Sequence, residues 1–99
     1  MKNFKVQLHG KNFLLNLDGE FKKYGFTTTI FVKAENSQKA EKMAIILTHQ
    51  NPNLRQTVLN ESSDRPIIHL EKIKEVSFLN FFAKKSTTDF RFYPEDEEQ

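Results

Sequence analysis

The first 17 residues alternate between polar and apolar side chains in two similar halves. Residues 2–8 are echoed nine positions later by residues 11–17, and the pair His9-Gly10 stands between the two halves. Strict alternation is typical of a strand with one buried face. With a two-residue loop, the apolar side chains of both halves fall on the same face. The pattern therefore predicts a hairpin of two strands that turns at His9-Gly10.

A third strand is predicted after a longer connection. Residues 18–25 contain two glycines with mostly charged residues between them, which favours a loop. Residues 26–34 then alternate again and are rich in β-branched side chains. Their expected core side consists of Phe26, Thr28, Ile30, Val32 and Ala34.

An amphipathic helix is predicted over residues 37–50. Asn36-Ser37 offers an N-cap. Apolar residues follow at helical spacing, namely Ala40, Met43, Ala44 and Leu47, and this stripe is expected to face the sheet. Asn51-Pro52 ends the helix, because proline cannot continue its hydrogen bonds. The same pair could also open a short second helix as far as about residue 59.

Two further strands are expected in the second half. In residues 67–76 the alternation of Ile68 and Leu70 is broken by Ile73, which predicts a bulge near Glu71-Lys72. Residues 89–93 form the last strand, with Phe90 and Phe92 facing the core and with Arg91 and Tyr93 facing outward. The predicted order is β-β-β-α-(α)-β-β. It indicates an α+β fold with a two-layer architecture, in which helices cover one face of an antiparallel sheet of about five strands.

Length and charge suit one small domain. The chain has 99 residues, of which 37% are apolar, and we expect a single α+β domain over residues 1–94 followed by an acidic tail over residues 95–99. Without Glu95, Asp96, Glu97 and Glu98 the net charge of +2 becomes +6. The tail is expected either to be solvated or to fold back over a basic face and compete with an anionic partner.

Several classes of protein are excluded by composition. The absence of cysteine removes disulfides, thiolate metal sites and cysteine nucleophiles. No apolar run approaches the roughly 20 residues of a membrane span, and the alternating N-terminus is unlike a signal peptide. We therefore expect a cytoplasmic protein with no membrane contact. The preference for lysine over arginine indicates an AT-rich, bacterial genome.

Three stretches of the chain carry a family resemblance. They are residues 8–15, residues 25–28 followed by residues 31–35, and residues 90–94. Together they resemble a small bacterial family of uncharacterised proteins of about 100 residues, whose function is unknown. The resemblance implies no activity and no catalytic residues.

No catalytic or cofactor motif is found in the sequence. His9, His49 and His69 lack metal-ligand spacing, and we expect three separate surface histidines. Glycine-rich phosphate loops, nucleophile elbows and zinc-protease motifs are all missing from the sequence. We therefore predict no enzymatic activity, no cofactor and no metal.

The most informative segment is residues 77–86. Phe78, Phe81 and Phe82 lie just before Lys84 and Lys85. The phenylalanines could close one end of the core, or form an exposed patch for a protein partner. They could also be a stacking platform for single-stranded nucleic acid, extended by Arg91 and Tyr93.

These patterns predict a non-enzymatic binding module. Its expected partner is another protein or a second copy in a homodimer, bound through the aromatic segment or by strand addition at an open sheet edge. The alternative is a basic nucleic-acid-binding domain modulated by its acidic tail. The candidate partner-binding residues are Phe78, Phe81, Phe82, Lys84, Lys85, Arg91 and Tyr93.

Overall fold

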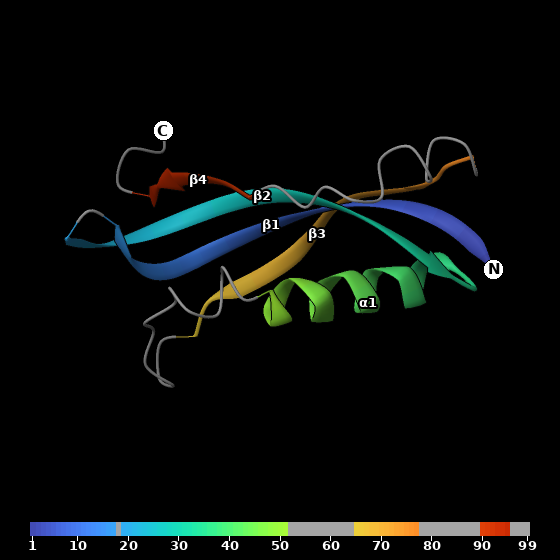
Figure 1. Cartoon of the computed structure of the whole chain (residues 1–99), viewed down its shortest axis with the longest axis horizontal. Helices are drawn as coiled ribbons and strands as arrows, with labels where there is room; N and C mark the ends of the chain where they lie inside the picture. The colour runs from blue at the N-terminus through green and yellow to red at the C-terminus, as the bar shows by residue number, and fades with distance from the viewer. Residues whose placement is uncertain (18, 52–64, 78–89, 96–99) are drawn as a thin grey trace.

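The chain folds around one antiparallel sheet with a helix on one side of it. The computed structural model describes residues 1–17, 19–51, 65–77 and 90–95. The elements are β1 (Lys2–Leu17), β2 (Glu20–Ala34), α1 (Ser37–Gln50), β3 (Ile67–Glu75) and β4 (Phe90–Pro94) (Figure 1). The strand order in the sheet is β3-β1-β2-β4, so β3 and β4 are its edges. The α+β class is therefore confirmed, with four strands rather than five in the described part of the chain.

The predicted hairpin at His9-Gly10 is wrong. β1 runs through this pair without turning, and its pairing with β2 shifts register between Gly10 and Phe13. Within this bulge Asn12 has a φ of 64°. The extra residue resets the alternation, which keeps Phe13 on the core side of the sheet. Glycine at position 10 lets the ring of Phe26 pack directly against the backbone of β1, because a Cβ there would lie 2.3 Å from that ring.

The hairpin turns instead between Leu17 and Glu20. Leu17 pairs with Glu20, and Gly19 has a φ of 81°. An Asp-Gly pair between strands is a strong hairpin signal, because glycine adopts positive φ without steric cost. The connection predicted over residues 18–25 is thus wrong beyond Gly19, since β2 begins at Glu20.

Other predicted elements are confirmed. The core side of β2 is buried from Phe26 to Ala34 at every second residue. α1 spans residues 37–50, and the Oδ1 of Asn36 accepts a hydrogen bond from the backbone N–H of Lys39 at 2.9 Å. β3 shifts register against β1 where Leu8 pairs with Leu70 and Gln7 with Lys72, so Glu71 is the predicted bulge residue.

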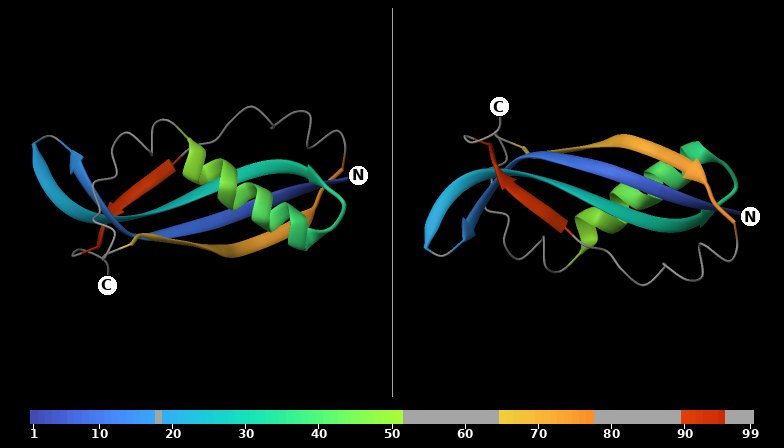
Figure 2. Two further views of the ribbon diagram at one scale, coloured as in Figure 1. Left: turned by 90° about the horizontal axis from the view of Figure 1, so that it is seen from below. Right: turned by 90° about the horizontal axis from the view of Figure 1, so that it is seen from above.

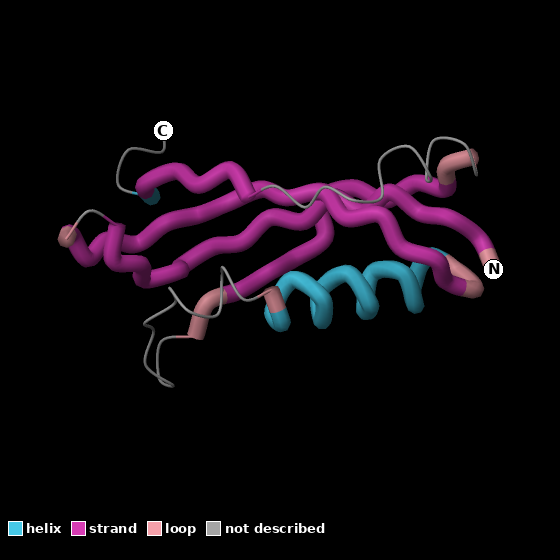
Figure 3. Tube along the Cα trace, viewed as in Figure 1, coloured by secondary structure: helices cyan, strands magenta, loops and turns pink. Residues whose placement is uncertain are grey.

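The core lies between α1 and the sheet, and it continues beyond the helix along the long β1–β2 hairpin. Figures 2 and 3 show α1 on one side of the strands. Beneath the helix, Ala40 and Ala44 pack with buried residues of β1 and β2, namely Phe4, Val6, Leu8, Ile30, Val32 and Ala34. A second cluster toward the hairpin end contains Phe13, Leu15 and Phe26, with Tyr24, Ile68 and Phe90 against it. Phe92 pairs with Phe26 but remains 39% exposed.

The face that α1 turns to the sheet differs from the prediction. Ala40, Ala44 and Thr48 are buried, whereas Met43 and Leu47 are 40% and 45% exposed. Residues four apart form one row along a helix, and small side chains in that row let the helix approach the strands closely. The predicted stripe was therefore correct for the alanines and wrong for Met43 and Leu47.

Some predictions fall on residues outside the described ranges. These are the second helix over residues 52–59, the aromatic segment around Phe78, and residues 96–99 of the tail. Within the described ranges, no helix has the length and apolar character needed to cross a membrane.

Candidate functional site

The face of the sheet opposite α1 carries mainly polar, basic and aromatic side chains. We call it the outer face and define it by the described residues that point away from the helix in β3, in β4, in β1 as far as Lys11 and in β2 from Thr27 onward. Because successive strand residues alternate between faces, the pairing of the strands and the β3 bulge assign it these members: Asn3, Lys5, Gln7, His9, Lys11, Thr27, Thr29, Phe31, Lys33, Ile67, His69, Glu71, Lys72, Lys74, Arg91 and Tyr93.

Positive charge dominates the outer face. Its cations come from all four strands and are Lys5, Lys11, Lys33, Lys72, Lys74 and Arg91. Among these described positions, Glu71 is the only carboxylate. Lys72, Lys74 and Arg91 are exposed. A surface with this balance of charge attracts anions and speeds their association.

One row of residues crosses the whole outer face. His69 pairs with His9, His9 pairs with Thr27, and Thr27 pairs with Arg91. The rings of His9 and His69 have centroids 5.3 Å apart with an angle of 57° between their planes. The row therefore runs from an exposed imidazole at one sheet edge to a guanidinium at the other.

Tyr93 reaches over β2 to join this row. It pairs with Gly25, and a Cβ on Gly25 would lie 2.3 Å from the Tyr93 ring. The space left by the missing side chain lets the phenol hydrogen-bond to Nε2 of His9, and the two rings lie 5.7 Å apart. Gly25 thus explains how a β4 side chain contacts β1, although β2 lies between the two strands.

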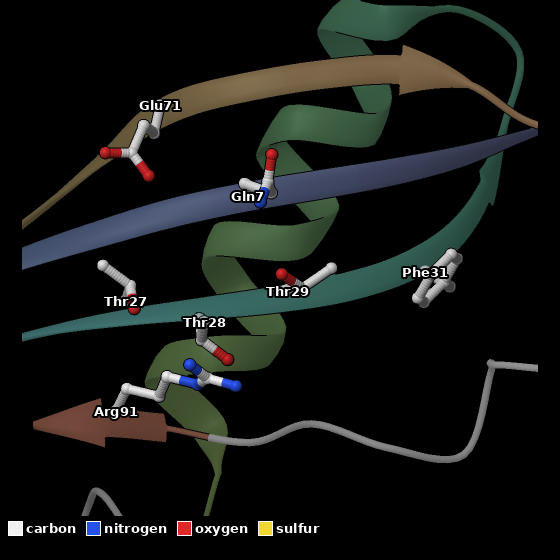
Figure 4. A pocket seen from close by; sticks show the side chains of 7 residues that line it. All are labelled: Gln7, Thr27, Thr28, Thr29, Phe31, Glu71 and Arg91. Carbon is white, nitrogen blue, oxygen red and sulfur yellow. The ribbon is translucent and has the colours of Figure 1, made fainter.

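A pocket of about 370 Å³ opens on the outer face beside this row. Every strand contributes to its lining, which in the described part of the chain consists of Gln7, Thr27, Thr28, Thr29, Phe31, Glu71 and Arg91. Figure 4 shows Glu71 on β3 and Arg91 on β4 at opposite sides, with Gln7 and the threonines between them. The pocket combines an anion, a cation, hydroxyls, an amide and an aromatic wall.

The structure places two of the predicted site residues on this surface. Arg91 lines the pocket and Tyr93 lies beside it, both facing outward as predicted. Phe78, Phe81, Phe82, Lys84 and Lys85 lie outside the described residues.

Sequence analysis missed the other pocket residues. Four of them lie on the outer side of β1 and β2, whereas these strands were predicted from the apolar residues of their core side; the four are Gln7, Thr27, Thr29 and Phe31. The alternation along these strands could have identified them, because the side chains opposite the core residues face solvent and can contact a ligand.

The histidines fall into two groups. His9 was expected at a turn but lies within β1, where it contacts His69, while His49 lies in the last turn of α1. The expectation of three separate histidines is therefore wrong for this pair. No group of three metal-ligating side chains is found among the described residues.

Glu95, the first residue of the predicted acidic tail, is hydrogen-bonded to the bulge of β1. The backbone N–H of Asn12 donates a hydrogen bond to Oε2 of Glu95 at 2.6 Å. The amide of Asn12 also donates to the carbonyl oxygen of Arg65 at 3.2 Å and its Oδ1 accepts from Lys23 at 2.5 Å. Glu95 thus lies beside the β1 bulge.

A second, apolar surface lies on α1. Met43, Ile46 and Leu47 are exposed at helical spacing, and Ile46 is the most exposed of the three at 54%. They lie on the helix side of the molecule, away from the pocket.

Comparisons with protein-family models, with curated proteins and with solved structures give no match for this chain.

Proposed function

We propose that the protein binds single-stranded nucleic acid on the outer face of its sheet. The observation that carries the proposal is the excess of cations on this face, where the described strand residues include six lysines and arginines and only Glu71 as a carboxylate. Phosphate groups bind lysine and arginine with release of counterions, which supplies most of the affinity in such complexes.

The shape and side chains of the face favour a single strand over a duplex. Proteins that bind single strands combine a basic track with aromatic rings and polar groups that accept unstacked bases. The outer face has both, since His9, His69 and Phe31 lie among the lysines and the pocket opens beside them. The described elements place no helix on this face that could enter a major groove.

Binding is tested by fluorescence anisotropy with a labelled single-stranded 12-mer and the matching duplex, over a range of salt concentrations. We expect the single strand to bind more tightly. We also expect the logarithm of its association constant to fall linearly with the logarithm of salt, by about 0.7 for each phosphate contact.

Two double variants of equal net charge distinguish binding at the outer face from a general attraction between a basic protein and nucleic acid. Lys72→Gln/Lys74→Gln removes two outer-face cations, and Lys39→Gln/Lys42→Gln removes two cations of α1. The first should reduce the salt slope by about 1.4, and the second should leave the slope unchanged. An equal reduction of the salt slope in both variants would overturn the proposal, and so would the absence of binding by the unmodified protein at low salt.

A homodimer remains a second candidate, as the aromatic segment first suggested. The observation that favours it is the exposed set Met43, Ile46 and Leu47 on α1, because exposed apolar patches mark contact surfaces and a twofold contact can be self-complementary. Light scattering should then give a dimer mass that Ile46→Ser/Leu47→Ser converts to a monomer mass. A monomer at all concentrations would reject this candidate.

A further inference from the structure

Glu71 is an anomaly on a surface that attracts phosphate. It is exposed, and its carboxylate takes part in no hydrogen bond or ion pair within the described part of the chain. A negative group at this place weakens any purely electrostatic binding of a polyanion. It also lines the pocket, where the bulge of β3 inserts it as the extra residue between Leu70 and Lys72.

An ionised carboxylate can only accept hydrogen bonds, and its two oxygens suit a partner with two adjacent donors. Among the common bases, guanine alone has two neighbouring donors on its Watson–Crick edge, the N1–H and the N2 amino group. Adenine and cytosine each present an amino group beside an acceptor nitrogen, and uracil and thymine present one N–H between two carbonyl oxygens. A carboxylate that faces the Watson–Crick edge of any other base therefore meets an acceptor atom beside the donor, whereas guanine offers it two adjacent donors.

The cation across the pocket completes the match. Arginine donates two hydrogen bonds to O6 and N7 of guanine, which form the edge adjacent to N1. Glu71 and Arg91 lie on the two edge strands, separated across the sheet by three interstrand spacings of about 4.8 Å each. Glu71 is also displaced along β3, two residues from His69, which lies in the same row as Arg91. Figure 4 shows Thr27 between the two side chains, with the guanidinium of Arg91 beside Thr28 and with Gln7 and Thr29 to one side. The pocket that they line with Gln7 and the threonines has a volume of about 370 Å³, and Phe31 forms an apolar wall of it.

From this arrangement we infer that the pocket binds a guanine base, with Glu71 accepting from its Watson–Crick edge and Arg91 donating to O6 and N7. The inference rests on the proposed function, because the lysines of the outer face would hold the phosphates on either side of the bound base. It adds a base preference that charge alone does not give.

The test uses labelled oligouridine 9-mers with one central guanosine, inosine, adenosine or cytidine, measured by anisotropy at a single low salt concentration. We expect guanosine to bind about 5- to 150-fold more tightly than adenosine, the range for one good bidentate contact. Inosine lacks the N2 amino group and should fall between the two. This comparison needs no variant of the protein.

Glu71→Gln should weaken the preference for guanosine, because an amide presents one donor and one acceptor, while the contact of Arg91 with O6 and N7 should remain. Its matched control is Glu75→Gln, which removes the same charge from the same strand at a position paired with Phe4 on the helix side. The control should keep the preference. Circular dichroism confirms that both variants fold.

The outcomes separate the two proposals. Equal binding of all four oligonucleotides, with the expected salt slope, would overturn the guanine pocket and leave the nucleic-acid surface intact. Equal loss of preference in both glutamate variants would also overturn the pocket. Failure of every oligonucleotide to bind at low salt would overturn the proposed function and the pocket with it.

Discussion

The Nε2 of His9 and the hydroxyl of Tyr93 are hydrogen-bonded although they lie 84 residues apart, and they join two strands that are not neighbours in the sheet. The contact crosses β2 at Gly25, whose missing side chain leaves room for the phenol ring. Because β4 is an edge strand of five residues paired only with β2, this bond is a second attachment of β4 to the sheet.

Tyr93→Phe should lower the free energy of unfolding by about 0.5–1.5 kcal/mol, the net value of one hydrogen bond. Urea denaturation followed by circular dichroism measures the change. Tyr24→Phe is the matched control, because its ring packs against the second core cluster and no hydrogen bond of its hydroxyl occurs among the described residues. Equal losses in the two variants would show that the His9 contact contributes nothing of its own.

Gly10→Ala should destabilise the protein by about 1–3 kcal/mol, the usual cost of forcing an extra group into a packed core. The new Cβ would lie 2.3 Å from the ring of Phe26, which is fully buried and cannot swing into solvent. Gly19→Ala is the comparison, because nothing lies within 4 Å of its Cβ and only its φ of 81° is unfavourable. It should cost roughly 1 kcal/mol. Thermal unfolding that ranks Gly19→Ala as the more damaging change would contradict the packing role of Gly10.

These two glycines also show what the sequence could and could not predict. The Asp18-Gly19 pair is a stronger hairpin signal than His9-Gly10, but the repeat of residues 2–8 in residues 11–17 favoured the wrong pair. A repeat of alternating residues fits two paired strands as well as one long strand with a bulge, because both keep the apolar side chains on one face. The difference depends on Phe26 packing over Gly10, which is a tertiary contact.

The candidate site was also predictable only in part, because some of its features depend on single strands and others on tertiary structure. The outward direction of Arg91 and Tyr93 and the bulge at Glu71 followed from alternation within single strands. The pocket did not, because it requires the order β3-β1-β2-β4. That order brings Glu71 and Arg91 to opposite sides of Gln7, and alternation within a strand carries no information about which strands are neighbours.

Thr28→Val should stabilise the protein by about 1 kcal/mol, because its Oγ1 is buried and has no hydrogen-bond partner among the described residues. Valine has nearly the same shape and does not leave a buried polar atom unsatisfied. Thr48→Val is the matched control, since the hydroxyl of Thr48 is also buried but donates to the carbonyl oxygen of Ala44 at 2.8 Å. Chemical denaturation should show a loss for the control, and a loss of similar size at Thr28 would mean that its hydroxyl is satisfied in solution.

Shortening the chain to residues 1–95 should raise its affinity for a single-stranded oligonucleotide. The change removes Asp96, Glu97 and Glu98 and keeps Glu95, whose carboxylate binds the backbone of Asn12 beside the hairpin end of the sheet. Removing three carboxylates, at a few tenths of a kcal/mol for each charge interaction, gives roughly a three- to tenfold increase at low salt. Added salt should shrink this increase, because screening acts on exposed charges. Full-length protein with Asp96→Asn, Glu97→Gln and Glu98→Gln distinguishes charge from bulk and should match the shortened chain in anisotropy titrations. An increase that appears only on shortening, or that persists unchanged in high salt, would show that the tail acts by steric cover and not by competing with phosphate.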